Sequence, residues 1–203
     1  MPELQLEEGS FFEVIYQLKL VGLVITSELT WSAHVDYTVN RVNKILWQLT
    51  RFKQLGAAED KLITFYKLKI RSILMFGAVC FHSSLTTQQS QLLELQQRRS
   101  LAIILGSQYR NYEHARTLVN LPRLDIFRQE ACLNWSIKAS SNPKHSHLFP
   151  LSSSNVDTRN RKKYDEYFCR SAKYYKSAVP SMTRALNKYS AKKQETYTEP
   201  HVE

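Results

Sequence analysis

The carboxylates and histidines come first, because these side chains carry most phosphoryl-transfer and metal chemistry. A two-metal phosphoryl-transfer site needs clustered carboxylates to hold its ions a few ångströms apart. The chain has five aspartates, none adjacent in the sequence: Asp36, Asp60, Asp125, Asp157 and Asp165. It also has no glycine-rich phosphate loop and no Cys-x-x-Cys zinc pair. The sequence therefore predicts no catalytic residues, no metal site and no cofactor.

Two pairs of side chains have spacings that metal sites use. His34 and Asp36, with a third ligand such as His114 or His145, have the residue types of the two-histidine, one-carboxylate iron site. The surrounding pattern is helical, and residues two apart on a helix do not face each other, which disfavours this set. His145 and His147 form the second pair, but two ligands do not complete a site.

Positive charge is the clearest chemical feature. The 203 residues include 28 Lys and Arg against 18 Asp and Glu, for a net charge of +10. Residues 1–60 carry 5 basic and 8 acidic side chains, residues 61–120 carry 8 and 2, and residues 121–203 carry 15 and 8. This asymmetry favours an anionic partner, with nucleic acid first. The alternative is a set of solvated helix faces that keeps the protein soluble.

The most basic stretch interleaves cations with aromatic rings. Residues 159–176 hold seven basic and five aromatic side chains: Arg159, Arg161, Lys162, Lys163, Arg170, Lys173, Lys176, Tyr164, Tyr167, Phe168, Tyr174 and Tyr175. In single-stranded nucleic-acid sites, rings stack on bases while cations contact phosphates. The alternative is a surface segment whose rings pack on a helical bundle.

These side chains must be positioned by a mainly helical scaffold that begins with a short β-hairpin. Residues 14–26 are rich in β-branched and aliphatic side chains, which predicts one or two strands, with Gly22 at a bulge or close backbone contact. A helix is then predicted from an N-cap at Thr30 or Ser32 to Gly56. Its apolar residues recur every third or fourth position: Val35, Val39, Val42, Leu46 and Leu49.

Four more helical stretches follow, at residues 58–79, from the Thr86–Thr87 cap to Gly106, at 112–119, and from Leu121–Pro122 to before Asn142–Pro143. Their short connections predict antiparallel neighbours in a bundle. In the first stretch, one helix face holds Leu62, Tyr66, Ile70, Ile73 and Gly77, and Phe65 and Leu74 widen it. Helical spacing is also followed by Leu92, Leu95, Arg99, Ala102 and Ile103 in the second, and the last carries Leu124, Phe127, Ala131 and Trp135. Cys80, which follows an apolar helix, is expected to be buried.

Several blocks, in the same order and spacing, resemble the region after the polymerase palm in reverse transcriptases of non-LTR (LINE, CR1/L2/jockey-like) retrotransposons. They span roughly residues 14–190 and read LVGLVITSELTWSAHV, RVNKILWQLTRFK, LITFYKLKIRSILMFGAVCFHSSL, LLELQQRRSLAIILG, ARTLVNLPRLDIFRQEACLNWSIKA, NPKHSHLFP and FCRSAKYYKSAVPSMTRALN. The resemblance implies a thumb and downstream fragment without the catalytic palm, and therefore no polymerase activity.

The resemblance also implies a division of the chain: the end of a palm-like β segment at 1–27, a helical thumb-like bundle at 28–138, a linker at 139–158, a basic aromatic segment at 159–191 and a disordered tail at 192–203. By analogy with a thumb that grips primer–template, its candidate phosphate and base contacts are Lys44, Arg51, Lys53, Lys67, Lys69, Arg71, Arg170, Tyr174 and Tyr175. Trp31 and Trp47 are expected in the core. The implied partner is an RNA–DNA hybrid or other nucleic acid, in the nucleus.

Two other functions stay open. One is a structural remnant whose orphaned apolar face around residues 14–26 binds the missing palm domain or a second copy. The other follows from residues 29–34, Leu-Thr-Trp-x-x-His, which also resemble an amino-terminal module of an AlkB-like tRNA-modifying protein. A dioxygenase of that kind would need iron at His34 and Asp36. No apolar run reaches the length of a membrane span, and three distant cysteines predict an intracellular protein without a disulfide framework.

Overall fold

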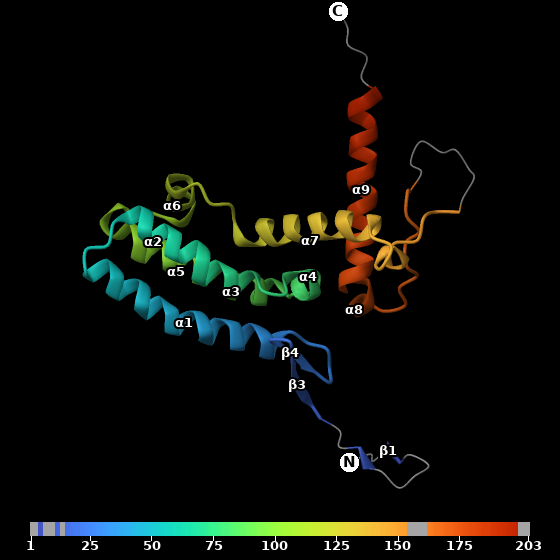
Figure 1. Ribbon diagram of the computed structural model, residues 1–203, viewed down its shortest axis with the longest axis horizontal. Coiled ribbons are helices and arrows are strands. Elements are labelled where there is room, and N and C mark those ends of the chain that lie inside the picture. Colours follow the sequence, from blue (N-terminus) through green and yellow to red (C-terminus); the bar gives the residue numbers. More distant parts are fainter. Residues whose placement is uncertain (1–3, 6–10, 13–14, 154–161, 199–203) are drawn as a thin grey trace, which may run out of the picture. The chain divides into compact units, whose positions relative to one another are not determined.

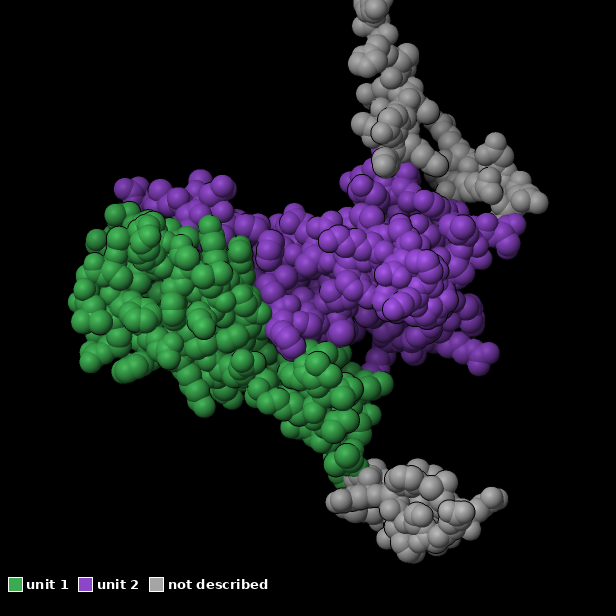
Figure 2. All heavy atoms as spheres, in the orientation of Figure 1, with its two compact units in different colours: residues 1–74, 86–109 green, residues 75–85, 110–203 purple. Residues whose placement is uncertain are grey.

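The computed structural model describes residues 4–5, 11–12, 15–153 and 162–198, with side chains described over 15–153 and 162–192. The chain is mainly helical, which confirms the predicted fold class (Figure 1). It divides into two compact units, coloured in Figure 2: residues 1–74 with 86–109, and residues 75–85 with 110–203. Within the described residues, no helix is both long and apolar enough to cross a membrane.

The first unit begins with β-hairpins. The short strands β1 (Leu4–Gln5) and β2 (Phe11–Phe12) pair with each other, as do β3 (Gln17–Leu20) and β4 (Leu23–Thr26). Val21 and Gly22 join β3 to β4 with φ angles of 47° and 85°. Two consecutive positive φ angles suit a tight hairpin turn, so Gly22 belongs to the turn and not to the predicted bulge.

Helix α1 (Ser32–Gln54) packs its predicted apolar face inward, except that Val39 is only half-buried. The buried positions include two polar residues and are His34, Val35, Thr38, Val42, Leu46 and Leu49. The N-cap is Trp31, not Thr30 or Ser32, and no side chain caps the helix. Thr30 instead bonds to Thr26 at the end of β4, with 3.3 Å between the hydroxyl oxygens.

The chain returns through α2 (Glu59–Phe65), a π-helical turn η1 (Tyr66–Ile70) and α3 (Arg71–Met75). The buried residues recur every fourth position: Leu62, Tyr66, Ile70 and Leu74. In a regular α-helix a spacing of four drifts by about 40° per step, and the wider π turn offsets this drift. Leu74, predicted to widen this face, is fully buried, whereas Ile73 is only half-buried and Gly77 lies after the helix with φ 68°.

Helix α5 (Thr87–Leu105) starts and stops where the sequence predicts, between a Thr86–Gln89 capping box and Gly106, which begins the 3₁₀ turn η3 (Gly106–Gln108). It runs parallel to α1, because Gln89 contacts Ser32 near both N-termini and Arg99 contacts Asn43 further along. In this bundle the chain direction alternates from α1 to the α2–α3 segment to α5, so α1 and α5 are parallel.

The side chains that mark the helical spacing of α5 in the sequence are not its buried ones. Leu92 and Leu95 are each 40% exposed and Arg99 is exposed, whereas the buried side chains include Leu93, Gln96, Gln97, Ser100, Leu101 and Ile104. The Tyr66 hydroxyl donates to Oε1 of Gln97 over 2.6 Å. Polar groups can be buried when they are hydrogen-bonded, so hydrophobicity alone does not identify the buried face of α5.

The second unit is built from helices and turns: α4 (Ala78–Phe81), η2 (His82–Ser84), α6 (Tyr112–Val119), α7 (Leu124–Ser141), η4 (Ser146–Leu148), α8 (Ala172–Tyr175) and α9 (Ala178–Thr198). Helix α6 matches its predicted stretch, and α7 ends before Asn142 as predicted but begins at Leu124, two residues after Pro122. Helix α9 continues to Thr198, although disorder was predicted from Lys192; residues 199–203 lie outside the described part.

The core of this unit includes part of the predicted linker. Phe149 is 2% exposed and packs edge-on against Tyr164, with ring centroids 6.5 Å apart. Leu151 and Tyr164 form a β-bridge, and Asn187 of α9 bonds to the backbone nitrogen and oxygen of Tyr164. Residues 139–153 are therefore tied into the fold; 154–158 lie outside the described residues.

Apart from Leu124, the buried side chains of α7 are not the apolar ones that mark this helix in the sequence. Its buried residues are Leu124, Arg128, Cys132, Ser136 and Ala139, one position on from Phe127, Ala131 and Trp135. Arg128 is fully buried, and its Nε donates to Nδ1 of His82 over 3.5 Å. Because the buried side chains of α7 include an arginine, the apolar residues alone do not identify its buried face.

Candidate nucleic-acid interface

The outward face of α1 carries a stripe of cations and aromatic rings, which we call the α1 stripe: Tyr37, Arg41, Lys44, Trp47 and Arg51. Steps of three and four residues keep these positions on the side away from Val42 and Leu46, which are buried. At 1.5 Å per residue the stripe is about 21 Å long. The sequence from residue 37 to residue 58 contains no Asp or Glu. No acidic residue of this segment therefore neutralises the positive charge of the stripe.

The N-terminal end of the stripe is a cluster around Tyr37. The Lys19 ammonium of β3 lies 4.6 Å from the centroid of its ring, and the Arg41 guanidinium lies 5.6 Å from it. A hydrogen bond from Lys19, together with the charges of Lys19 and Arg41, lowers the pKa of the Tyr37 phenol. The hairpin thus adds a cation to the helix surface.

The C-terminal end of the stripe centres on Trp47, whose side chain is 65% exposed. The Arg51 guanidinium lies 5.7 Å from its ring and also donates to Gln54 over 3.0 Å. From α5, Arg99 donates to Asn43 over 2.9 Å, which brings another cation to the turn before Trp47. The prediction that Trp47 belongs to the core is wrong; Trp31 is half-buried and packs edge-on against His34.

The other predicted contacts of this unit do not join the stripe. The Lys53 ammonium bonds to the backbone oxygen of Ile104 in the last turn of α5, where it also lies 3.3 Å from the position that a Cβ on Gly106 would take. Cations are favourable at a helix C-terminus, so Lys53 has a structural role. Lys67, Lys69 and Arg71 lie on η1 and α3, with Lys69 exposed and the other two half-buried.

The predicted contacts of the second unit lie around α8. Arg170 is exposed, and Tyr174 and Tyr175 are 44% and 50% exposed. The Arg184 guanidinium of α9 lies 3.6 Å from the Tyr175 ring and donates to the Tyr175 backbone oxygen over 2.6 Å. The Tyr175 ring is therefore held against α9 by a cation. The start of the basic segment, residues 159–161, lies outside the described residues.

The candidate iron ligands diverge. His34 is 3% exposed and its Nδ1 accepts a hydrogen bond from the Val24 amide over 3.4 Å, whereas Asp36 is exposed. Burial lowers the pKa of His34. His145, which precedes η4, and His147, which lies within it, are both exposed. Within the described residues, no group of three His, Cys, Asp or Glu is placed to hold a metal ion.

The cysteines lie in the second unit. Cys80 on α4 is exposed, so the prediction of its burial is wrong, and Cys132 on α7 is buried. Partial burial nevertheless raises the pKa of the Cys80 thiol, and burial raises the pKa of Cys132 to about 11. Both groups are therefore poor thiolates at neutral pH, which disfavours nucleophilic chemistry at either position.

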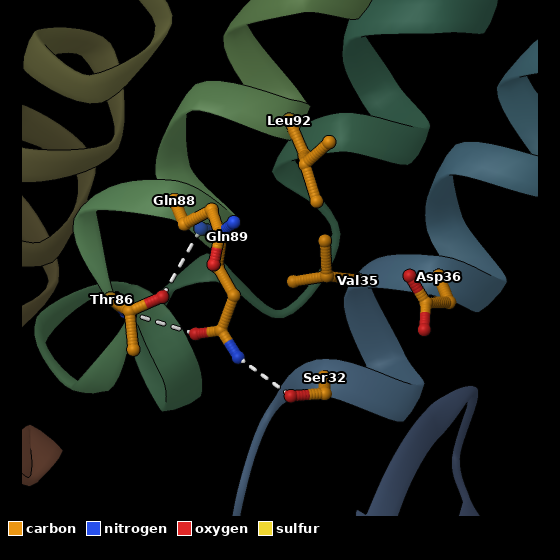
Figure 3. A pocket seen from close by; sticks show the side chains of 7 residues that line it. All are labelled: Ser32, Val35, Asp36, Thr86, Gln88, Gln89 and Leu92. Carbon is orange, nitrogen blue, oxygen red and sulfur yellow. Dashed lines mark hydrogen bonds between the residues drawn. The ribbon is translucent and has the colours of Figure 1, made fainter.

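A pocket of about 370 Å³ lies between the N-terminal turns of α1 and α5 (Figure 3). Gln89 bridges the two helices: its side chain accepts from the Thr86 amide and donates to the Ser32 hydroxyl, each over 2.9 Å. These bonds cap α5 and align it with α1. The lining residues are Ser32, Val35, Asp36, Thr86, Gln88, Gln89 and Leu92.

The pair formed by half-buried His82 and buried Arg128 should make stability depend on pH. Burial, and then the Arg128 charge, lower the pKa of His82 to about 4, against 6.5 when unfolded. The unfolded chain therefore binds more protons between these values, and the free energy of unfolding falls as the pH drops from 6.5 to 4. Because His82 is only half-buried, solvent screening reduces the loss to roughly 1–2 kcal/mol.

Urea denaturation at several pH values between 4 and 7.5 checks this prediction. His82→Gln keeps a hydrogen-bond acceptor for Arg128 but removes the titration, so the variant should lose stability less steeply on acidification. His147→Gln, at an exposed position, is the matched control and should follow the wild-type curve. Equal pH dependence in the wild type and His82→Gln would contradict the assignment.

Sequence reasoning missed part of the α1 stripe. The predicted contacts include Lys44 and Arg51 but not Lys19, Tyr37 or Arg41, and Trp47 is a predicted core residue. The spacing 37, 41, 44, 51 was a usable signal, since it marks one helix face opposite the apolar one. The contribution of Lys19 had no local signal, because it depends on how β3 lies against α1.

Comparisons of this chain with protein families, with curated proteins and with solved structures find no match.

Proposed function

We propose that this chain binds nucleic acid non-specifically, through phosphate contacts made by the α1 stripe. The observation that carries the proposal is the run of Arg41, Lys44 and Arg51 along one exposed helix face without an acidic residue in that segment. Phosphate contacts by Lys and Arg supply sequence-independent affinity. The resemblance to non-LTR reverse transcriptases supports the same partner, an RNA–DNA hybrid or another nucleic acid held by a thumb-like fragment without polymerase activity.

Fluorescence anisotropy with labelled RNA–DNA hybrid, duplex DNA and single strands tests the proposal. Each probe is titrated at several salt concentrations. Non-specific phosphate binding should give micromolar or tighter affinity at low salt, a steep decrease as salt rises and little dependence on probe sequence. Absence of binding at low salt, where phosphate contacts are strongest, would overturn the proposal.

A second candidate function is self-association through the β3–β4 hairpin. Leu18 and Leu20 are 47% and 52% exposed, and they pair with Ile25 and Leu23 on the same face of the hairpin. Val24 is buried, and side chains alternate along a strand, so this apolar face points away from the unit's core. An exposed apolar face on a two-stranded sheet favours association with another chain.

The double substitution Leu18→Thr/Leu20→Thr tests self-association. Threonine keeps the strand preference but removes the apolar surface, so the variant should be monomeric under conditions in which the wild type forms dimers or larger species. Light scattering after size-exclusion chromatography measures the mass. Leu68→Thr/Leu118→Thr, which changes two leucines elsewhere that are 67% and 53% exposed, should associate like the wild type. A monomeric wild type at high concentration would exclude this function.

A further inference from the structure

Trp47 is an unusual surface residue for a helix that has a well-formed apolar face. Tryptophan is highly buried on average, yet this indole is 65% exposed on the outward side of α1. Its position lies one residue from Leu46 and two from Leu49, both of which are buried in the core. Because successive side chains of a helix point in different directions, burial of Leu46 and Leu49 leaves Trp47 at the surface.

The surroundings of Trp47 favour an anionic, planar ligand. Lys44 lies one helical turn before it and Arg51 one turn after it, about 10 Å apart along the axis. Gln54 accepts a hydrogen bond from Arg51, which holds the guanidinium near the indole. Arg99 contributes a further cation through Asn43. A flat aromatic surface between cations matches the base and phosphates of a nucleotide.

Only an unpaired base can use the indole. Bases in a duplex or hybrid are stacked on each other, whereas a single strand can place a base against a protein ring. The cations would bind phosphates in either case, because phosphate contacts do not depend on base pairing. Stacking on Trp47 therefore adds affinity for single strands alone.

We propose that Trp47 is a stacking platform for an unpaired base, and that the α1 stripe consequently prefers single-stranded nucleic acid to duplexes and hybrids. The inference rests on the proposed nucleic-acid binding and names its substrate class. Trp47 lies next to cations, and the stripe has no acidic residue. This charge pattern favours nucleic acid over an apolar protein as the partner.

The test measures affinity for a single strand and for the duplex of the same sequence. In the wild type the single strand should bind more tightly. Trp47→Ala should weaken single-strand binding by about tenfold and duplex binding by less than about twofold, since stacking is lost and phosphate contacts remain. Trp47→Phe, which keeps a ring, should retain part of the preference. Leu55→Ala, another exposed apolar residue of the same region, should leave both affinities unchanged.

A second readout reports on the ring itself. In the Trp31→Phe/Trp135→Phe chain, Trp47 is the remaining tryptophan, and its fluorescence should be quenched by a single strand and not by the duplex. Circular dichroism of Trp47→Ala checks that the helices persist. Binding without any difference between single strand and duplex, or a preference that survives in Trp47→Ala, overturns this inference but not the proposed function. Absence of binding to every probe overturns both.

Discussion

Reversal of three charges on the α1 stripe, in Arg41→Glu/Lys44→Glu/Arg51→Glu, should weaken nucleic-acid binding by about 100-fold or more at 50 mM salt. Each phosphate contact to a single strand contributes a salt slope of about −0.7, which at this concentration corresponds to almost one power of ten in affinity. Three lost contacts therefore lower the affinity by more than two powers of ten. The measurement is anisotropy with a labelled single strand.

The milder substitution of the same residues by Gln should lower the salt slope by about two, because three contacts are removed without new repulsion. The matched control is Arg110→Glu/Lys138→Glu/Lys144→Glu, which makes the same change in net charge at exposed positions of the other unit. It should lose much less affinity. Equal losses in the two variants would mean that net charge, and not the stripe, determines binding.

Lys53→Met separates the structural cation from the proposed contacts. Because the Lys53 ammonium bonds to the last turn of α5, its removal should lower the stability and leave the affinity close to that of the wild type. A large loss of affinity in Lys53→Met, with stability unchanged, would show that Lys53 contacts nucleic acid and has no structural role.

Tyr66→Ala should lower the free energy of unfolding of the first unit by about 3–5 kcal/mol, the usual cost of truncating a buried aromatic side chain. Tyr66 is completely buried, and its hydroxyl donates to Gln97 over 2.6 Å. Burial raises the pKa of this phenol, so it stays protonated and remains a donor. The residue also begins the π turn that keeps every fourth side chain in the core.

Urea denaturation measures the loss, and hydrogen exchange of the amides in α2 and α5 localises it to the first unit. Tyr66→Phe keeps the ring and removes one hydrogen bond, so it should cost only about 1 kcal/mol. Tyr189→Ala, at a position 42% exposed, is the control and should have a small effect. A loss below about 1 kcal/mol in Tyr66→Ala would show that the core contacts and hydrogen bond of this side chain are not needed for stability.

The positions of several helices could be predicted because their signals are local. The Thr86–Gln89 capping box and Gly106 bound α5, and the residues 112–119 match α6. Caps, glycine stops and apolar spacing act within one or two turns, so the sequence alone contains them. The faces of α5 and α7 could not be predicted in this way, since Gln97 and Arg128 are buried through partners distant in sequence.

For the candidate interface, the sequence by itself determined the excess of positive charge and the placement of Lys44 and Arg51 on a helix. Only the tertiary structure decided which cations lie together. In the folded chain, Lys53 bonds to the end of α5, Lys19 and Arg99 lie at the surface of α1, and Trp47 is exposed. The physical reason is that helix periodicity fixes which residues share a face, whereas long-range packing determines which face reaches solvent and what lies beside it.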